Sequence, residues 1–444
     1  MDAVLLKNSL AVAIEALSWM AYTGLGERTA LFKAASQIGV KRADELRQAH
    51  RLIMETTRFQ NRLDYLISSV IPAGEAEELP HGIRSFLKII AYLKYIDGTS
   101  QNELIRSVAD ARQILGWREL QPFEKQIAEI AAGKVNPQLC SLPEFERLSL
   151  ETCHPAWFVS RLVREFGRSF ALQILRRDLQ PMSTYVRLNP LKTTSEARNA
   201  EIDNQLGGSR VDGLVDVFLL GKKGRRSRFV ESGELVIQDL ASIVAGYAAS
   251  PRPGESVLDI CAAPGNKTTL LAAQMHNEGM IYSLDISGPR LSFWKRAMRL
   301  CGCEIATPIR ADARRIPLKI EADTVLVDPP CSNSGVFARN PAGKWTLTPT
   351  RMNELSLRQN LILQAASDHV SPKGTLVYCT CSILPEENEY VIETFLRKNP
   401  QFKVVPQKPF LGSPGLRGLD RCQRFYPHIH ECNGYFIAKL ERSD

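Results

Sequence analysis

The chain has 444 residues, of which 44% are hydrophobic and 23% charged, and its formal net charge is +8. This length suits two or three domains, and the composition provides ample apolar material for their cores. No apolar run approaches the roughly 20 residues of a membrane span, and the first residues, MDAVLLKNSL, do not resemble a signal peptide. We therefore expect a cytoplasmic monomer without membrane contact, whose ten cysteines are reduced.

The N-terminal third has the apolar periodicity of helices. Hydrophobic side chains recur at helical spacing in three stretches, 3–20, 53–70 and 86–96. No alternating strand pattern interrupts residues 1–135. The sequence predicts a compact helical bundle over 1–140, and segment 134–146, which contains two prolines, has the character of a linker.

The pattern changes near residue 150, where short β-rich runs appear at 184–188, 214–220 and 234–237. After residue 250, strands and helices alternate. The predicted strands are 256–260, 280–286, 324–328 and 375–381, and the predicted helices between the first of them are 266–275 and 289–301. This order predicts an α/β domain over 236–444 with a parallel, doubly wound, Rossmann-like sheet.

The positive charge is unevenly distributed. Residues 1–150 carry 18 basic and 18 acidic side chains, so the whole excess lies in 151–444. A basic C-terminal portion indicates a polyanionic partner. The densest run is GKKGRRSRF (221–229), which contains Lys222, Lys223, Arg225, Arg226 and Arg228. Such a run forms either a solvated loop or a phosphate contact.

The segment LDICAAPGNKTTLL follows a predicted strand and opens a helix. Its small residues Ala262, Ala263 and Gly265 allow the backbone to approach a ligand closely. Asp285 ends the next strand, where an acid accepts hydrogen bonds from ribose hydroxyls, and Asp312 lies where a third strand should end, near an adenine edge. A generic Rossmann turn is the alternative, although the GxGxxG spacing of NAD sites and the GxxxxGK[ST] spacing of P-loops are both absent.

Two cysteines follow two predicted strands. The motif DPPCSNSG contains Cys331, and CTCSILPEENE contains Cys381. Both lie at the carboxyl edge of the sheet, so we expect the two thiols to converge on one pocket. Pro329 and Pro330 stop the first strand and stiffen the loop that presents Cys331. Amino-group methylation uses an aromatic residue after the two prolines, so a cysteine there favours methylation of carbon.

Such thiols are suited to methylating cytosine at C5. That carbon is a poor nucleophile until a thiolate adds to C6, which makes C5 carbanion-like and able to attack a methyl sulfonium. The C5 proton then leaves and the thiol is eliminated. A carboxyl group or a cation near N3 and O2 stabilises the charge on the ring, and Asp328 and Lys267 are the candidates. The chemistry alone does not decide which of Cys331 and Cys381 is the nucleophile.

The other cysteines have a simpler interpretation. We interpret four of them as buried, inert side chains: Cys261, Cys301, Cys303 and Cys379. A metal-binding Cys379–Cys381 pair is the alternative for Cys379. Four residues near the C-terminus imitate a zinc site: Cys422, His428, His430 and Cys432. Their spacing matches no common zinc module, so we expect no metal.

At these residues the sequence closely resembles the Nol/Nop/Sun family of RNA cytosine-C5 methyltransferases. The resemblance covers roughly 150–444 and rests on motifs that occur in the family's order: RLNPLKTT, QDLAS, LDICAAPGNKTT, DPPCSNSGVFARNP, KW (344–345), YCTCSILPEENE and RFYPHIHECNGYFIAKL. It implies S-adenosylmethionine as cofactor. It also implies that residues 150–235 form a small α+β subdomain of the RNA-recognition type.

The resemblance assigns roles to individual residues. The nucleophile of the T-C-S motif is Cys381, and Cys331 assists product release. Lys267 belongs to the A-P-G-x-K turn, and Asp328 contacts the base. The implied cofactor residues are Cys261, Ala262, Ala263, Pro264, Gly265, Lys267, Asp285, Arg290, Asp312 and Asp328. Asn266 stands where the family commonly has a glycine, and other branches of the family carry a small polar residue at this position.

The N-terminal helices, with ETTRFQNRLDYLISSV (55–70), resemble a NusB-type RNA-binding domain. The whole layout then resembles the branch that methylates small-subunit (16S) ribosomal RNA, so we expect an RNA partner and favour rRNA. Methylation of tRNA and a non-catalytic role in ribosome assembly are the alternatives for the whole protein, and a scaffolding role is the alternative for the bundle. The target base must leave its stack, so we expect a single-stranded or loop RNA, with phosphate contacts from the basic run.

Overall fold

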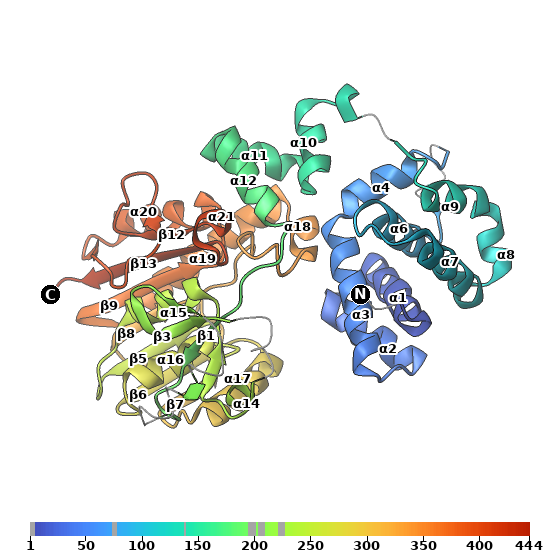
Figure 1. Cartoon of the computed structure of the whole chain (residues 1–444). Coiled ribbons are helices and arrows are strands. Elements are labelled where there is room, and N and C mark those ends of the chain that lie inside the picture. The colour runs from blue at the N-terminus through green and yellow to red at the C-terminus, as the bar shows by residue number, and fades with distance from the viewer. Residues whose placement is uncertain (1–4, 73–77, 137–138, 194–200, 203–208, 221–226) are drawn as a thin grey trace. The chain divides into compact units, whose positions relative to one another are not determined.

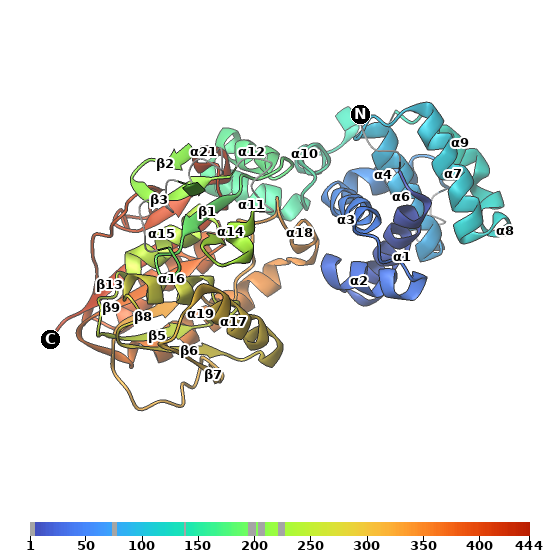
Figure 2. The same cartoon turned by 60° about the horizontal axis from the view of Figure 1, so that its bottom comes forward.

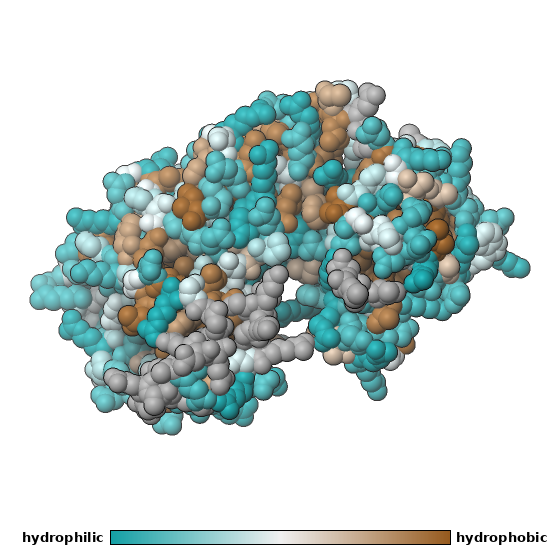
Figure 3. Space-filling view, in the orientation of Figure 1, coloured by the Kyte–Doolittle hydropathy of each residue, from teal (hydrophilic) through white to brown (hydrophobic). Residues whose placement is uncertain are grey.

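The computed structural model describes residues 5–72, 78–136, 139–193, 201–202, 209–220 and 227–444. The chain divides into two compact units. We call Met1–Gln180 with Asn340–Thr346 the helical unit, and Pro181–Arg339 with Leu347–Asp444 the sheet unit. Among the described residues, no helix combines the length and apolar character needed to cross a lipid bilayer. On the face drawn in Figure 3, hydrophilic residues predominate.

The helical unit confirms the predicted helices. Its elements in chain order are α1 (Lys7–Thr23), α2 (Glu27–Ile38), α3 (Ala43–Arg58), α4 (Gln60–Ser68), α6 (His81–Tyr95), α7 (Gln101–Leu115), α8 (Trp117–Leu120), α9 (Glu124–Ala131), α10 (Glu144–Thr152), α11 (Ala156–Phe166), α12 (Arg168–Arg177) and the distant α18 (Ala342–Thr346). Helix α6 is buried on most sides because it packs against α1, α4, α7 and α9. Phe86, Ile89 and Ile90 have no exposed surface and lie in the core of the bundle.

The helical unit extends beyond the predicted boundary at residue 140. Asn61 donates to the carbonyl of Ser149 at 2.9 Å, and Arg58 donates to the carbonyl of Asp178 at 2.8 Å. These buried contacts attach α10 to α12 to the bundle, so the predicted start of a small subdomain at 150 falls inside the helical unit. Local sequence patterns do not reveal such long-range packing. The relation to NusB stays a prediction.

The sheet unit begins with a small antiparallel sheet of order β2-β3-β1-β4. Its strands are β1 (Tyr185–Leu188), β2 (Ser209–Val211), β3 (Leu214–Leu219) and β4 (Leu235–Ile237), which confirms the three β-rich runs, and α14 (Arg228–Glu231) lies between β3 and β4. Val186, Phe218 and Phe229 form its core. The α+β character of this region is therefore as predicted.

The main sheet has the order β11-β12-β13-β9-β8-β5-β6-β7, and β10 pairs with β13. Figure 2 shows the strands from β13 to β7 in this sequence. The parallel strands are β5 (Ser256–Ile260), β6 (Met280–Asp285), β7 (Ala306–Arg310), β8 (Ala322–Val327) and β9 (Val370–Thr380). The antiparallel strands are β10 (Phe402–Val404), β11 (Ser413–Pro414), β12 (Gln423–Phe425) and β13 (Tyr435–Arg442).

The sheet is therefore mixed, whereas the sequence predicted a parallel one. The predicted strands are present and parallel, but β13 adds an antiparallel neighbour to β9. The short connection through α21 (Pro427–His430) makes β12 and β13 antiparallel to each other, and β13 runs opposite to β9. The Rossmann-like core remains as predicted.

Helices cover both faces of this sheet. They are α15 (Leu240–Ala249), α16 (Asn266–Gln274), α17 (Gly288–Cys301), α19 (Pro349–Ser367) and α20 (Glu389–Lys398). Val257 faces the core shared with α15 and α16, and its neighbour Leu258 faces the core shared with α19 and α20. Both faces are thus buried, and the carboxyl edge is where polar side chains gather.

Candidate active site

The turn after β5 forms a small cradle at the carboxyl edge. Cys261 has φ 64° and Gly265 has φ 110°, and α16 begins at the next residue. Residues with a side chain rarely adopt a φ of 110°, so glycine is required there, and a Cβ would also lie 2.8 Å from the Met298 Cε. A cavity of about 130 Å³ lies against the turn, lined by Ser242, Asp259, Cys261, Ala262, Ala263, Pro264, Asn266, Lys267 and Asp328.

Asp285 lies beside this turn because β5 and β6 are parallel neighbours. Its carboxylate accepts hydrogen bonds from the backbone N–H groups of Ala263 at 3.2 Å and Ser287 at 2.9 Å. Arg290 forms an ion pair with it at 3.2 Å and donates to the carbonyl of Ala263. The structure thus brings together the predicted turn, acid and arginine.

Asp312 follows β7 and has a different environment. Arg314 binds its carboxylate through the guanidinium at 2.6 Å and through the backbone N–H at 2.9 Å. The side-chain hydrogen bond from Arg314 lowers the pKa of Asp312 to about 2. Within the described ranges, no hydrogen bond or ion pair joins Asp312 to the other predicted cofactor residues. Its role toward an adenine stays a prediction.

Lys267 and Asp328 form an ion pair at the ends of two neighbouring parallel strands, β5 and β8. Lys267 Nζ lies 2.7 Å from the Asp328 Oδ2 and 5.6 Å from the centre of the Tyr435 ring. Burial alone would lower the pKa of Lys267, but the negative charge of Asp328 outweighs it and raises the pKa. The lysine therefore stays charged at neutral pH, as a group that stabilises negative charge must be.

Asp259 is a site residue that the sequence reasoning missed. It lines the cavity, is 1% exposed and accepts a hydrogen bond from Thr268 at 2.6 Å. Burial raises its pKa to about 6. Its other carboxylate oxygen, Oδ1, is buried and has no partner among the residues that the structure describes. An unpaired buried oxygen beside a glycine cradle fits a ligand that donates hydrogen bonds, as a cofactor's ammonium does.

The two predicted thiols meet. Strands β8 and β9 are parallel neighbours, and the Sγ atoms of Cys331 and Cys381 are 3.2 Å apart. The Asn333 Oδ1 lies 2.9 Å from the Sγ of Cys381. The hydrogen bond to Cys381 and burial both raise the pKa of Cys331 well above its ordinary value. Cys331 therefore stays a protonated thiol at neutral pH while Cys381 lies beside it.

A buried carboxylate holds the two cysteine loops together, and the sequence reasoning did not identify it. Glu387 has no exposed surface. It accepts hydrogen bonds from the backbone N–H of Ser332 at 2.8 Å and from the hydroxyls of Ser332 and Ser382. Gln359 donates to it at 2.9 Å. Each serine directly follows one of the two cysteines, so this single carboxylate fixes the spacing of the thiols.

Two glycines bring the backbones of these loops into contact. The N–H of Gly335 donates to the carbonyl of Cys381 at 2.9 Å, and the N–H of Gly434 donates to the carbonyl of Gly335 at 2.8 Å. A Cβ on Gly335 would lie 2.0 Å from the Gly434 oxygen. The motifs around 335 and 434 are therefore parts of one packed structure behind the thiols.

The remaining cysteines differ in exposure: Cys140 is exposed, and Cys261 and Cys303 are half-buried where the sequence predicted buried side chains. Cys301 and Cys379 are buried, and burial raises the pKa of the half-buried Cys303 to about 11. Cys422 and Cys432 are also buried, and His430 accepts a hydrogen bond from the N–H of Tyr426. Across the described part of the chain, no three His, Cys, Asp or Glu residues gather as metal ligands would.

The predicted RNA-binding run lies mostly outside the described residues. Lys222, Lys223, Arg225 and Arg226 fall in the undescribed segment 221–226. Arg228 lies at the start of α14, where it is exposed and forms an ion pair with Glu201. The phosphate contacts of this run remain a prediction.

The strand order locates the ligand edge. Open α/β sheets bind ligands outside the carboxyl ends of the strands where the order reverses, which here is between β5 and β8. The solved structure of a methyltransferase homologue from Pyrococcus horikoshii has this fold, with a TM-score of 0.60 and 29% identity over 68% of this chain and 99% of that one. The fold and the position of its ligand-binding edge are those of an S-adenosylmethionine-dependent methyltransferase. Residues 247–441 of this chain match the model of the RsmB/F family of 16S rRNA methyltransferases, and its methyltransferase domain belongs to that family.

Individual relatives extend this result. A protein of Bacillus subtilis, described as a probable ribosomal RNA small subunit methyltransferase B, is 29% identical over 88% of this chain and 89% of its own. The tRNA (cytosine(72)-C(5))-methyltransferase of Pyrococcus horikoshii is 36% identical over 54% of this chain and 61% of its own. The solved structure of the protein PH0851 has a TM-score of 0.84 and 28% identity, with 100% of both chains covered.

Proposed function

We propose that this protein methylates C5 of a cytosine in small-subunit (16S) ribosomal RNA, with Cys381 as the nucleophile. The observation that carries the proposal is the 3.2 Å approach of the Cys331 and Cys381 sulfurs at the carboxyl edge. The Lys267–Asp328 ion pair lies at the same edge. A thiol for addition to the ring and charged groups for the resulting anion are what C5 methylation requires.

The coverage of the relatives favours rRNA. The small-subunit methyltransferase B of Bacillus subtilis matches 88% of this chain, so the match extends into the N-terminal helices. The archaeal tRNA enzyme matches 54%. Its higher identity keeps tRNA as the second candidate. A non-catalytic assembly factor would be free to lose the cofactor turn or the cysteines, and this chain retains both.

The residues of this chain divide the chemistry among them. The cradle after β5, Asp285 and Arg290 would hold S-adenosylmethionine, which would supply an electrophilic methyl group. The Cys381 thiolate adds to C6 of the flipped cytosine, and Lys267 and Asp328 stabilise the charge at O2 and N3. C5 then bonds to the methyl carbon as the methyl–sulfur bond of the sulfonium breaks, which would leave S-adenosylhomocysteine. Transfer of the C5 proton to a water molecule allows the C6–S bond to break, which restores the ring and frees Cys381 as a thiolate, and Cys331 assists this release.

The remaining predictions complete the proposal. The N-terminal helices act as a NusB-like RNA-binding domain, and the basic run from Lys222 to Arg228 contacts phosphates. The protein then acts on RNA in the cytoplasm. The resemblance of the sequence supports the RNA-binding role of the helices, and its charge supports the phosphate contacts of the basic run. A salt titration of RNA binding, compared between the wild type and a variant with the basic run neutralised, measures those phosphate contacts.

Replacement of Cys381 by Ala tests the nucleophile. We expect methyl transfer to 16S rRNA to disappear while binding of S-adenosylhomocysteine, measured by calorimetry, persists. The matched control is Cys140→Ala, because Cys140 is exposed and lies in the helical unit. Full activity of Cys381→Ala would refute the assignment. Bisulfite sequencing of cellular RNA with and without the protein distinguishes rRNA from tRNA.

Replacement of Cys331 by Ala tests the release step. Because addition to C6 still proceeds, we expect an RNA–protein adduct that survives denaturing electrophoresis and is absent from the Cys331→Ala, Cys381→Ala double variant. Normal turnover by Cys331→Ala without an adduct contradicts the release role and leaves the nucleophile unaffected.

A further inference from the structure

The helical unit contains a second cavity, far larger than the cradle at the carboxyl edge. Its volume is about 330 Å³, and residues of α1, α3, α4, α6 and α18 line it. This volume lies at the lower end of the roughly 300–1,000 Å³ that small-molecule sites occupy. All its lining residues belong to the helical unit, and the proposed chemistry uses none of them.

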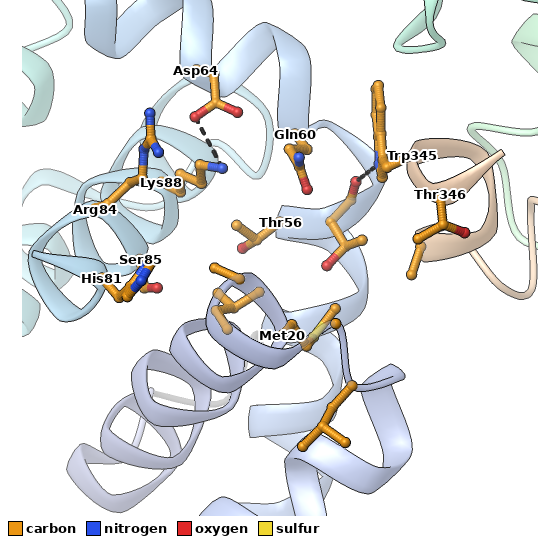
Figure 4. Close-up of a pocket in the computed structure, with 16 residues that line it drawn as sticks. Met20, Thr56, Gln60, Asp64, His81, Arg84, Ser85, Lys88, Trp345 and Thr346 are labelled. Carbon is orange, nitrogen blue, oxygen red and sulfur yellow. Dashed lines mark hydrogen bonds and ion pairs between the residues drawn. The ribbon is translucent and has the colours of Figure 1, made fainter. Parts of the chain in front are cut away.

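Two opposite walls of the cavity differ in chemistry, since one is basic and the other is aromatic. Figure 4 shows Arg84, Lys88 and His81 of α6 on one side and Trp345 of α18 on the other. Lys88 is paired with Asp64 at 2.9 Å. No hydrogen bond or ion pair to Arg84's guanidinium is found within the described ranges, so its charge is available to an anion.

The indole of Trp345 is fixed in place. Its Nε1 donates to the carbonyl of Thr57 at 2.7 Å, and the side chain is half-buried. A hydrogen-bonded indole at a cavity wall offers a rigid apolar surface, which is how proteins stack single-stranded bases.

Two buried hydroxyls between these walls point to a missing partner. Thr56 and Thr57 line the cavity and are 1% and 2% exposed. Neither Oγ1 has a hydrogen-bond partner among the residues that the structure describes. A buried hydroxyl without a partner costs about 1–3 kcal/mol, so such groups are normally satisfied. Figure 4 places Thr56 and the amide-bearing Gln60 between the basic wall and the indole.

We propose that this cavity binds one unstacked nucleotide of the RNA substrate, which rests on the function proposed above. The base stacks on Trp345, its polar edge takes hydrogen bonds from the Thr56 and Thr57 hydroxyls, and the phosphate pairs with Arg84. Helix α18 follows the Cys331 loop in the chain, so one short stretch supplies a thiol to the sheet unit and an indole to the helical unit.

Arg84→Gln and Thr56→Val in the full-length protein test the proposal. Steady-state methylation of 16S rRNA should show a KM for RNA that rises about 5- to 30-fold with kcat unchanged, because each variant removes one polar contact to the nucleotide and leaves the stacking indole intact. At tenfold per about 1.4 kcal/mol this corresponds to about 1–2 kcal/mol. Affinity for S-adenosylhomocysteine should stay the same. The controls are Arg106→Gln and Thr29→Val, exposed positions on α7 and α2 outside the cavity. A KM for RNA equal to that of the wild type in both cavity variants overturns the proposal.

Photocrosslinking gives a readout that does not depend on methylation. A short single-stranded RNA that contains 4-thiouridine should crosslink to peptides covering 56–60 or 342–346, and Arg84→Gln should weaken that crosslink. If the wild-type protein forms the crosslink but does not methylate 16S rRNA, the result counts against the proposed function and leaves the nucleotide site standing. Absence of the crosslink overturns the nucleotide site, and tighter binding of free cytidine monophosphate than of the RNA overturns the RNA as its occupant.

Discussion

Two lysines of this protein are withdrawn from water, one in each unit, and their pKa values move in opposite directions. Lys267 in the sheet unit lies 2.7 Å from Asp328, and its pKa is raised. Lys344 in the helical unit is 1% exposed, and its Nζ donates to the carbonyl of Arg58 at 2.8 Å. Burial lowers the pKa of Lys344 to about 7.

The difference teaches that burial alone does not set the charge of a lysine. Lys344 receives smaller opposing effects from Cys153 and Asp178, which favour the charged form, and none of them outweighs desolvation. Lys267 has a carboxylate in direct contact. The sheet unit thus keeps a full positive charge at the site of the proposed chemistry, and the helical unit uses a similar side chain as a hydrogen-bond donor to a backbone carbonyl.

The largest effect should follow removal of the paired lysine. Lys267→Met leaves Asp328 without its partner and removes a charge from the proposed reaction centre. We expect the single-turnover rate of methylation to fall by about 10²–10³-fold, as when one preorganised electrostatic contact is lost. Lys344→Met is the matched control, and its rate should stay within about twofold of the wild type. Equal losses in both variants would show that the two lysines do not differ in role.

Glu387 is a third buried ionisable side chain, and it differs from both lysines because its carboxylate accepts several hydrogen bonds, all from neutral donors. Glu387→Gln should disturb the serines behind both thiols and lower kcat about 10- to 100-fold through misplacement of Cys381. The KM for RNA and the affinity for S-adenosylhomocysteine should not change. Glu393→Gln on α20, which removes an exposed ion pair with Arg417, is the control. A rise in KM without loss of kcat would place Glu387 outside the positioning of the thiols.

Sequence reasoning located the thiols, Lys267, Asp328 and Asp285 because each lies at the end of a recognisable strand or in the turn and helix that follow it. Parallel strands bring their carboxyl ends to one edge, so order along the chain was enough. Glu387 and Asp259 were missed because their importance lies in burial and in partners distant in sequence. The membership of α10 to α12 and of 340–346 in the helical unit depends on tertiary packing, which local periodicity does not record.

The smallest effect concerns stability and comes from the unpaired lysine. Lys344 has a folded-state pKa of about 7, below its ordinary value of 10.5. Between these values the unfolded chain holds a proton that the folded protein lacks, so raising the pH from 7 toward 10.5 stabilises the fold. Below pH 7 both states are protonated and Lys344 adds no slope. The slope is at most about 1.4 kcal/mol per pH unit.

Urea denaturation at several pH values measures this contribution as the difference between the wild type and Lys344→Met. The variant should lose the slope and be more stable than the wild type at pH 7 by about 1–3 kcal/mol, because an apolar side chain avoids desolvating a charge. Lys125→Met, at an exposed position on α9, should retain the wild-type slope. If Lys344→Met retains it as well, the buried amine is charged in the folded protein, and the contrast with Lys267 disappears.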